Sequence, residues 1–159
     1  MSVDQATFRS VLGRFASGVT VMTVRDRDTD HGMTASAFCS LSLDPPLVLV
    51  CIDRTTRMHE RLQSAEHFAV NLLAADQEMI SRRFAEPPDD SRFEGVGFTR
   101  GTTGAPLLTD ALAHLECELV KRYPGGDHTI IVGRVVGAAA AGDARPLLYY
   151  RGGYAELER

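Results

Sequence analysis

Hydroxyl side chains are concentrated immediately before one strongly apolar segment of the chain. Thr34, Ser36, Ser40 and Ser42 precede the run LVLVCI at 47–52. Small hydroxyl side chains satisfy backbone groups in turns, and the Asp-Pro-Pro sequence that follows them favours that role. The same groups donate and accept hydrogen bonds, so they also suit a polar ligand. The residues by themselves leave both roles open.

A histidine beside a glycine-rich turn is the second candidate for chemistry. His128 follows Gly125, Gly126 and Asp127, between two runs rich in β-forming residues. Such a histidine is either an ordinary hairpin residue or a functional group that the turn presents to a ligand. The local sequence is compatible with either interpretation.

Several familiar functional motifs are incomplete. The segment GRFASGVT (13–20) has the glycine spacing of a phosphate loop but lacks the Lys and Ser/Thr that should follow, and GVGFTR (95–100) lacks the third glycine of a dinucleotide fingerprint. No G-x-S-x-G elbow of a hydrolase occurs. The five histidines form no H-E-x-x-H motif and no close group with cysteine, so we expect no metal site.

The first half of the chain predicts strands with short helices between them. Apolar residues at helical spacing predict a helix over 4–16 with Asp4 as its N-cap, and VTVMTV (19–24) predicts a strand. A second strand is expected near 32–38. The continuous apolar run at 47–52 predicts a strand covered on both faces, by the core and by another element or subunit.

The middle of the chain alternates in the same way. A helix over 55–65 is expected to begin at Thr55 or Thr56, followed by a strand over 67–73. A helix over 75–86 is expected to be capped by Asp76.

The second half predicts a long loop and then more strands. Residues 88–112 show little periodicity and predict a loop that contains short strands. The segments 112–123 and 129–140 predict a hairpin. Its first strand should bury alternate residues and leave Glu116 and Glu118 on a solvated face. A last strand over 145–157 should turn at Gly152-Gly153. About six strands joined by turns favour an antiparallel β-barrel with peripheral helices.

Composition limits the class of protein. The 159 residues suit one domain, 1–159, with 44% hydrophobic and 24% charged residues. A net charge of -4 and a pI near 5.7 argue against nucleic-acid and anionic-membrane partners. No signal peptide and no apolar run long enough to span a membrane is expected. Three widely separated cysteines predict reduced thiols in a cytoplasmic protein.

Eight segments in order resemble the short-chain flavin reductase family, the reductase components of two-component flavin-dependent monooxygenases. Together they span nearly the whole chain. The segments are FASGVTVMTV (15–24), GMTASAFCSLSLDPPLVLVCID (32–53), FAVNLLAADQ (68–77), FA (84–85), GAPLL (104–108), LECEL (115–119), GGDHTIIVGRV (125–135) and LLYYRGGY (147–154).

This resemblance implies a fold and an assembly. The family fold is a mainly β, six-stranded antiparallel split barrel of the FMN-binding type, with Greek-key-like connections and peripheral helices. It forms a homodimer, and the flavin lies in a groove at or near the subunit interface.

The resemblance also implies a cofactor-binding set. Small hydroxyl groups and backbone amides would meet the polar edge of the flavin ring and its ribityl chain, and the residues after the apolar strand would hold the phosphate. The ring and ribityl contacts would come from Thr34, Ala35, Ser36, Ala37, Ser40, Leu41 and Cys51; the phosphate contacts from Asp53, Arg54, Thr55 and Thr56; and further contacts from Phe84, Arg14 and Tyr154.

Some positions depart from the family pattern. Ser36 and Ala37 stand where Asn and Ser are common, and Cys39 replaces a Thr. Ser36 can make some of the hydrogen bonds of Asn, whereas Ala37 can contribute only its backbone. Thr55 and Thr56 replace a pair of serines and keep both hydroxyl groups.

The implied reaction is hydride transfer from nicotinamide C4 to flavin N5, in which the cofactors carry the chemistry and the protein aligns them. His128 is the one residue with an implied catalytic role, orienting the carboxamide or the phosphate side of the nicotinamide nucleotide. Reduced flavin would then leave for a partner monooxygenase. The sequence does not distinguish FMN from FAD, and NADH is preferred over NADPH only by resemblance.

Two other functions remain open on the sequence. One is a split-barrel flavin oxidase of the pyridoxamine-phosphate oxidase type, which should have a basic pocket for an anionic substrate. No such cluster of basic residues is evident in the sequence. The other is a non-catalytic flavin carrier, which would bind flavin without oxidising NADH.

Overall fold

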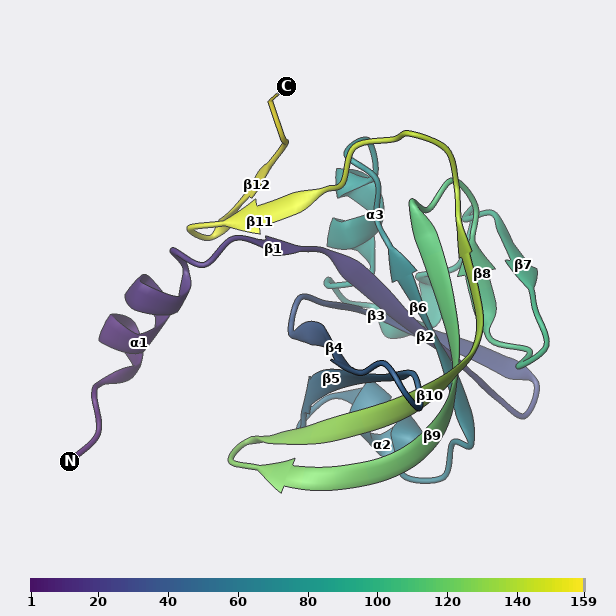
Figure 1. Ribbon diagram of the computed structural model, residues 1–159, viewed down its shortest axis with the longest axis horizontal. Coiled ribbons are helices and arrows are strands. Elements are labelled where there is room, and N and C mark those ends of the chain that lie inside the picture. Colours follow the sequence, from purple (N-terminus) through teal and green to yellow (C-terminus); the bar gives the residue numbers. More distant parts are fainter. Residues whose placement is uncertain (159) are drawn as a thin grey trace.

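The computed structural model describes residues 1–158, so the predicted domain 1–159 includes one residue, Arg159, outside the described range. Within that range three short α-helices and one 3₁₀ turn interrupt a mainly β chain (Figure 1). The helices are α1 (Gln5–Leu12), α2 (Arg57–Leu62) and α3 (Glu78–Arg83), and the 3₁₀ turn is η1 (Asp89–Ser91).

Side-chain caps explain where two of the helices begin. The Asp4 carboxylate accepts a hydrogen bond from the Thr7 backbone N–H, as predicted, and the Thr56 hydroxyl accepts one from the His59 backbone N–H at the start of α2. The expected cap of α3 was wrong. Its N-cap is Gln77, which makes no side-chain capping bond; Gln77 Oε1 instead accepts from the Ala74 N–H.

A seven-stranded antiparallel sheet forms the body of the molecule. Its spatial order is β3-β2-β6-β9-β10-β5-β4. The strands are β2 (Thr20–Asp26), β3 (Thr29–Ala35), β4 (Phe38–Ser42), β5 (Leu47–Asp53), β6 (His67–Leu72), β9 (Ala113–Gly125) and β10 (His128–Ala140).

Two smaller sheets accompany the main one. One pairs β1 (Ser17–Gly18) with β11 (Leu148–Tyr150), which pairs in turn with β12 (Gly153–Ala155). The other pairs β7 (Phe98–Arg100) with β8 (Pro106–Leu108), both inside the predicted long loop.

The sheet curls so that its first strand approaches the other end. Strand β3 contacts β5, although the two are far apart in the sheet order (Figure 1). The mainly β, antiparallel fold with few helices is therefore confirmed. The number of strands in the main sheet is seven rather than six, and no ladder among residues 1–158 joins β3 to β4.

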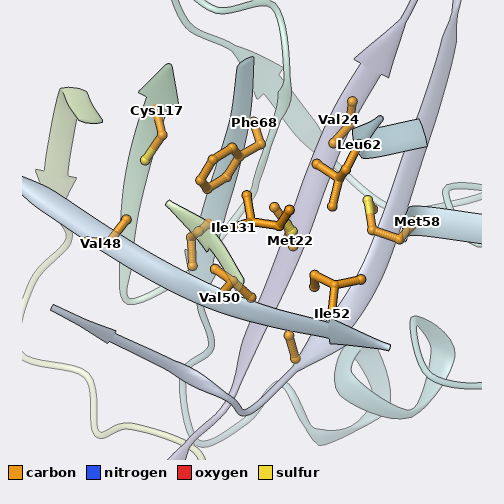
Figure 2. Packing of buried hydrophobic residues seen from close by; sticks show 12 residues of the cluster. Met22, Val24, Val48, Val50, Ile52, Met58, Leu62, Phe68, Cys117 and Ile131 are labelled. Atoms are coloured by element: carbon orange, nitrogen blue, oxygen red, sulfur yellow. The ribbon is translucent and has the colours of Figure 1, made fainter. Parts of the chain in front are cut away.

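The interior of the curled sheet is filled by one large apolar cluster. Met22, Val50, Ile52, Phe68 and Ile131 are all fully buried there, and their side chains converge in Figure 2. Full burial of such side chains contributes about 1.5–3 kcal/mol each before entropy is subtracted. This cluster fixes the strands that carry the predicted site residues.

Close packing explains one glycine of the hairpin. A Cβ at Gly133 would lie 2.4 Å from Cζ of Phe68, so a larger residue would displace the aromatic ring. A second cluster, which includes Leu108, Leu147 and the fully buried Phe84, packs beside the first.

The N-terminal arm, which we define as residues 1–18, extends away from this body and pairs with β11 through β1 (Figure 1). The apolar face of α1 has no partner within the described chain, and none of its residues is buried. Phe8 is 56% exposed and Phe15 is 79% exposed. The helical spacing of Phe8, Val11 and Leu12 is therefore confirmed, but the helix ends at Leu12, so Phe15 lies beyond it, and this apolar face does not pack on the core of the same chain.

One predicted burial pattern is met in part and another was wrong. Strand β5 alternates between buried and half-buried residues, so this chain covers one face fully and the other in part, and cover by a second subunit stays a prediction. Glu116 was expected in water but is buried, because the loop at Gly101–Thr103 folds over that face. The Thr103 N–H and hydroxyl both donate to its carboxylate.

The predicted last strand is a hairpin of two strands. Arg151 and Gly152 form its turn, both with positive φ (51° and 76°), and β12 returns antiparallel to β11. In residues 1–158, no helix has both the length and the apolar character needed to cross a lipid bilayer.

Candidate functional site

Three of the predicted threonines line one surface cavity. Thr34 at the end of β3, together with Thr55 and Thr56 before α2, faces a cavity of about 350 Å³, which we call the threonine cavity. Arg57 and Arg92 lie at the same cavity. Hydroxyl and guanidinium groups in one concave site suit a polar, anionic ligand.

The turn that follows β5 is braced by its own aspartate. The Asp53 carboxylate accepts hydrogen bonds from both the N–H and the hydroxyl of Thr55, each at 2.8 Å. The Thr55 backbone N–H is the main cause of the lowered pKa of Asp53. Thr56 donates its hydroxyl to the Asp53 carbonyl and caps α2. The threonine hydroxyls therefore shape the turn. A ligand would have to bind hydroxyl groups that already make hydrogen bonds within it.

The cations at this cavity are partly neutralised. Arg57 forms ion pairs with Asp89 and Asp90, and Arg92 pairs with Asp89 at 2.6 Å. The exposed Arg54, by contrast, makes no ion pair with residues 1–158. Its guanidinium is the cation at the predicted phosphate segment that is most available to a ligand.

A second cavity joins residues from both ends of the chain. Thr34, Ser36, Ser81 and Tyr154 line a space of about 220 Å³. The Tyr154 hydroxyl lies 2.7 Å from Ser81 Oγ, and the Thr34 hydroxyl donates to the Ser81 carbonyl at 2.6 Å. The guanidinium of Arg82 lies over the Tyr154 ring, 4.9 Å from its centroid. Predicted residues 120 positions apart in the sequence thus meet at one site.

The edge of the sheet carries the remaining predicted ring contacts. Ser40 and Leu41 are exposed on β4, at a bulge where two residues oppose one residue of β5. The Ala37 carbonyl accepts from the Cys51 N–H, so Ala37 is held against β5 through its backbone. Burial raises the pKa of the Cys51 thiol, with a smaller contribution from Cys39. Cys51 is therefore a poor nucleophile, as a packing role requires.

His128 lies directly across from the end of β5. It is the first residue of β10 and pairs with Asp53 in the antiparallel register. Its Nδ1 lies 2.7 Å from Oδ1 of Asp127, and its side chain is 39% exposed. The structure thus places the predicted histidine beside the predicted phosphate turn, accessible to a ligand.

Of the predicted residues, only Thr34, Ser36, Thr55, Thr56 and Tyr154 line these two cavities, and three of the others lie in the core or in the arm. Ala35 is buried in the core, and its carbonyl accepts from the Thr20 hydroxyl. Phe84 is fully buried against Phe93, although its carbonyl accepts from the Thr34 N–H. Arg14 lies beyond α1, in the arm, next to a separate cavity.

Sequence reasoning missed residues that support the site from the interior of the protein. Ser81 is fully buried and links Thr34 to Tyr154, but a serine within a short helix gives no pattern that would reveal this. His31, which was not among the predicted site residues, lies in β3 and lines the threonine cavity. Burial lowers its pKa, and its buried Nε2 has no hydrogen-bond partner in residues 1–158.

Residues 12–158 match the model of the flavin reductase like domain. The chain belongs to this family. The family model covers every cavity residue named above, and it agrees with the eight ordered segments found in the sequence.

Relatives and solved structures agree with this assignment. The chain is 40% identical over 157 residues to the reductase subunit HsaB of a flavin-dependent monooxygenase from Rhodococcus jostii, covering 99% of this chain and 80% of that protein. It is 44% identical over 154 residues to an NADH-dependent FAD reductase from Streptomyces globisporus, covering 94% and 84%.

The structure of the NADH:FAD oxidoreductase SgcE6 from Streptomyces globisporus, in complex with NAD and FAD fragments, is similar with a TM-score of 0.93. It shares 42% identity and covers 98% of this chain and 93% of its own. BorF, the flavin reductase component of a bacterial two-component tryptophan halogenase, is also 42% identical, with a TM-score of 0.91 and coverage of 98% and 99%.

Proposed function

We propose that this member of the family is an NADH-dependent flavin reductase that delivers reduced flavin to a partner monooxygenase. The observation that carries the proposal is the match to a structure that holds both NAD and FAD fragments, across 98% of this chain at 42% identity. The reductase subunits among the relatives support a partner oxygenase.

The residues around the two cavities fit a flavin. A flavin needs an apolar surface for its ring and polar groups for its edge, ribityl chain and phosphate. Thr34 and Ser36 offer hydroxyl groups at the second cavity. Cys51 and Leu41, which line neither cavity, would offer apolar surface on β5 and β4. Arg54 would hold the phosphate, with the turn built by Asp53 placing it there.

Other predicted residues would act through the backbone or by support. Ala35 and Ala37 have no polar side chain, so they would contribute backbone groups. Phe84 would support Thr34 from the core, since its carbonyl already accepts the Thr34 N–H. Tyr154 would close the cavity through its contact with Ser81.

The bound flavin and nicotinamide would supply the redox chemistry, with a hydride passing between them. The protein's part is to hold the two rings face to face, within about 3–3.5 Å, and to keep water from the space between them. His128 would orient the nicotinamide nucleotide from the edge of this site.

We propose that the chain acts as a homodimer in which the arm contacts the second copy. The apolar face of α1 is exposed at Phe8, Val11 and Leu12, and Phe15 just after the helix is exposed as well. A second copy would also cover the half-buried face of β5. The curled sheet would then correspond to the split barrel that the resemblance to the family implies. In the same assembly, Arg14 would lie near the flavin bound to the partner.

The choice of flavin follows the relatives, and the location follows the cysteines. FAD is favoured over FMN because an FAD reductase is among the similar proteins and FAD fragments occupy a similar structure. A cytoplasmic location fits the three free cysteines, one of them exposed.

A steady-state assay tests the function. Purified protein with free FAD or FMN should consume NADH at catalytic enzyme concentration, measured by the loss of NADH absorbance. A tightly bound yellow flavin with negligible NADH oxidation would indicate the carrier instead and reject the proposal.

The role of His128 has its own test. The His128→Ala variant should lose about tenfold in kcat/KM for NADH, the size expected for one or two hydrogen bonds, with unchanged flavin affinity. His67→Ala, on strand β6, is the matched control and should change neither value. Equal losses of NADH use and flavin binding in His128→Ala would contradict the assigned role.

A further inference from the structure

The hydrogen bond between neighbouring side chains at the β9–β10 turn has a consequence for the chemistry of His128. Asp127 Oδ1 lies 2.7 Å from Nδ1 of His128. An ionised carboxylate can only accept, so Nδ1 carries the proton in this contact. In a neutral imidazole the other nitrogen is then an acceptor. The bond to Asp127 therefore leaves Nε2 with a free lone pair.

The surrounding groups leave Asp127 as the partner of this ring. Asp53 lies across the ladder from His128, but its Oδ1 accepts from the N–H and the hydroxyl of Thr55, and within residues 1–158 its carboxylate makes no hydrogen bond to the His128 ring. The neighbouring His59 is occupied as well, with its Nε2 2.8 Å from the Thr129 hydroxyl. The backbone of Asp127 is itself held in place, because its carbonyl accepts from the Arg54 N–H at 3.0 Å.

The charges near His128 also indicate which part of the nucleotide it meets. Asp127 adjoins it in the sequence, and Asp53 faces it from β5. These two carboxylates disfavour a diphosphate at His128 itself, and the nearby cation Arg54 is taken by the flavin phosphate in the proposed function. A neutral N–H donor has no such penalty, and the carboxamide of nicotinamide supplies one.

We infer that Asp127 is a positioning residue that holds His128 in the Nδ1–H tautomer, so that Nε2 accepts a hydrogen bond from the carboxamide NH₂ of NADH. This inference rests on the proposed function and deepens it, because it selects the carboxamide over the phosphate side. Asp127 acts through His128 and makes no contact with the nucleotide.

The tautomer can be measured directly. Nitrogen-15 NMR of the histidine rings in the full-length protein distinguishes a protonated from an unprotonated ring nitrogen at pH 8. The wild-type protein should show His128 protonated at Nδ1, and Asp127→Ala should shift the population toward Nε2–H. Wild-type protein with the proton on Nε2 of His128 would overturn the inference whether or not the protein oxidises NADH.

A substrate analogue tests the carboxamide contact. Reduced acetylpyridine adenine dinucleotide has an acetyl group in place of the carboxamide and so lacks the NH₂ donor. The ratio of kcat/KM for NADH to that for the analogue should fall about fivefold in Asp127→Ala, the size of one solvent-accessible hydrogen bond. The different reduction potentials of the two nucleotides cancel when the ratio is compared between variants.

The matched control is Asp143→Ala, which removes an exposed aspartate after another turn glycine, Gly142. It should leave the ratio unchanged, which separates a specific effect from a change in net charge. An unchanged ratio in Asp127→Ala, with NADH turnover intact in wild type, would overturn the inference and leave the reductase function standing. Wild-type protein without NADH oxidation would reject both.

Discussion

Two phenylalanines of this chain have opposite surroundings. Phe68 in β6 is fully buried and packs against Gly133, whereas Phe15, just after α1, is 79% exposed. Both are large apolar side chains, and burying either one would release a similar free energy. In the body, this free energy is gained by packing within one chain, whereas the phenylalanine of the arm remains exposed. The difference indicates that the sheet provides the stability of the subunit and the arm provides contact surface.

The largest expected effect is on the body. Phe68→Ala should lower the free energy of unfolding by about 3–5 kcal/mol, because it leaves a cavity that the sheet cannot close. Urea denaturation at low protein concentration measures this. Phe15→Ala is the matched control and should change the value by less than about 0.5 kcal/mol. Similar losses in both variants would show that the arm packs on its own subunit in solution.

The next effect concerns assembly. If the arm contacts a second copy, Phe15→Ala should raise the dissociation constant of the dimer about tenfold or more, as expected for an aromatic residue central to an interface. Sedimentation equilibrium over a range of concentrations provides the measurement. Met79→Ala removes a side chain on α3 that is 83% exposed and should leave the constant unchanged. A monomeric wild-type protein would remove the assembly role assigned to the arm.

The smallest effect is a pH dependence within the body. Burial alone would raise the pKa of Asp30, but hydrogen bonds and charge from Arg100 and Arg25 outweigh it, and the pKa is lowered. A carboxyl whose pKa falls on folding contributes stability above its unfolded pKa of about 3.9, and that stability is lost as the pH decreases through the lower, folded value.

Asp30→Asn should therefore reduce stability at pH 7 by about 1 kcal/mol or less, the range for partly exposed pairs. The difference from wild type should shrink as the pH is lowered below 4, as measured by thermal unfolding across pH. Asp28→Asn is the control, because Asp28 is fully exposed and its contact with Arg25 is long, at 3.9 Å. An Asp30 variant whose deficit grows at low pH would contradict this sign.

Local features of the chain were largely predictable from the sequence. The caps at Asp4 and Thr56 and the long hairpin depend on nearby residues, and the structure has them where they were expected. Glu116 was misplaced because its burial depends on the loop around Thr103, which is distant from the predicted hairpin pattern. A period-two pattern cannot report on a loop that folds over one face.

The site was predictable only in part, because its residues come from distant segments of the chain. The proximity of Thr34 to Thr55 and Tyr154 followed only from the resemblance, since no periodicity connects residues so far apart. The buried Ser81 between them left no signal in the sequence. Phe84 illustrates the converse: its position in a shared segment was recognised, but its ring faces the core.

The pairing of β5 with β10 restricts how the length of the chain can vary. The ladder runs without a shift from His128 opposite Asp53 to Arg134 opposite Leu47. Because side chains alternate between faces, a residue gained or lost in the turn at Gly125–Asp127 that slipped β10 by one position against β5 would turn His128 to the opposite face of the sheet. Insertions and deletions that preserve function should therefore avoid this turn and accumulate in exposed segments outside the ladders, such as 141–144.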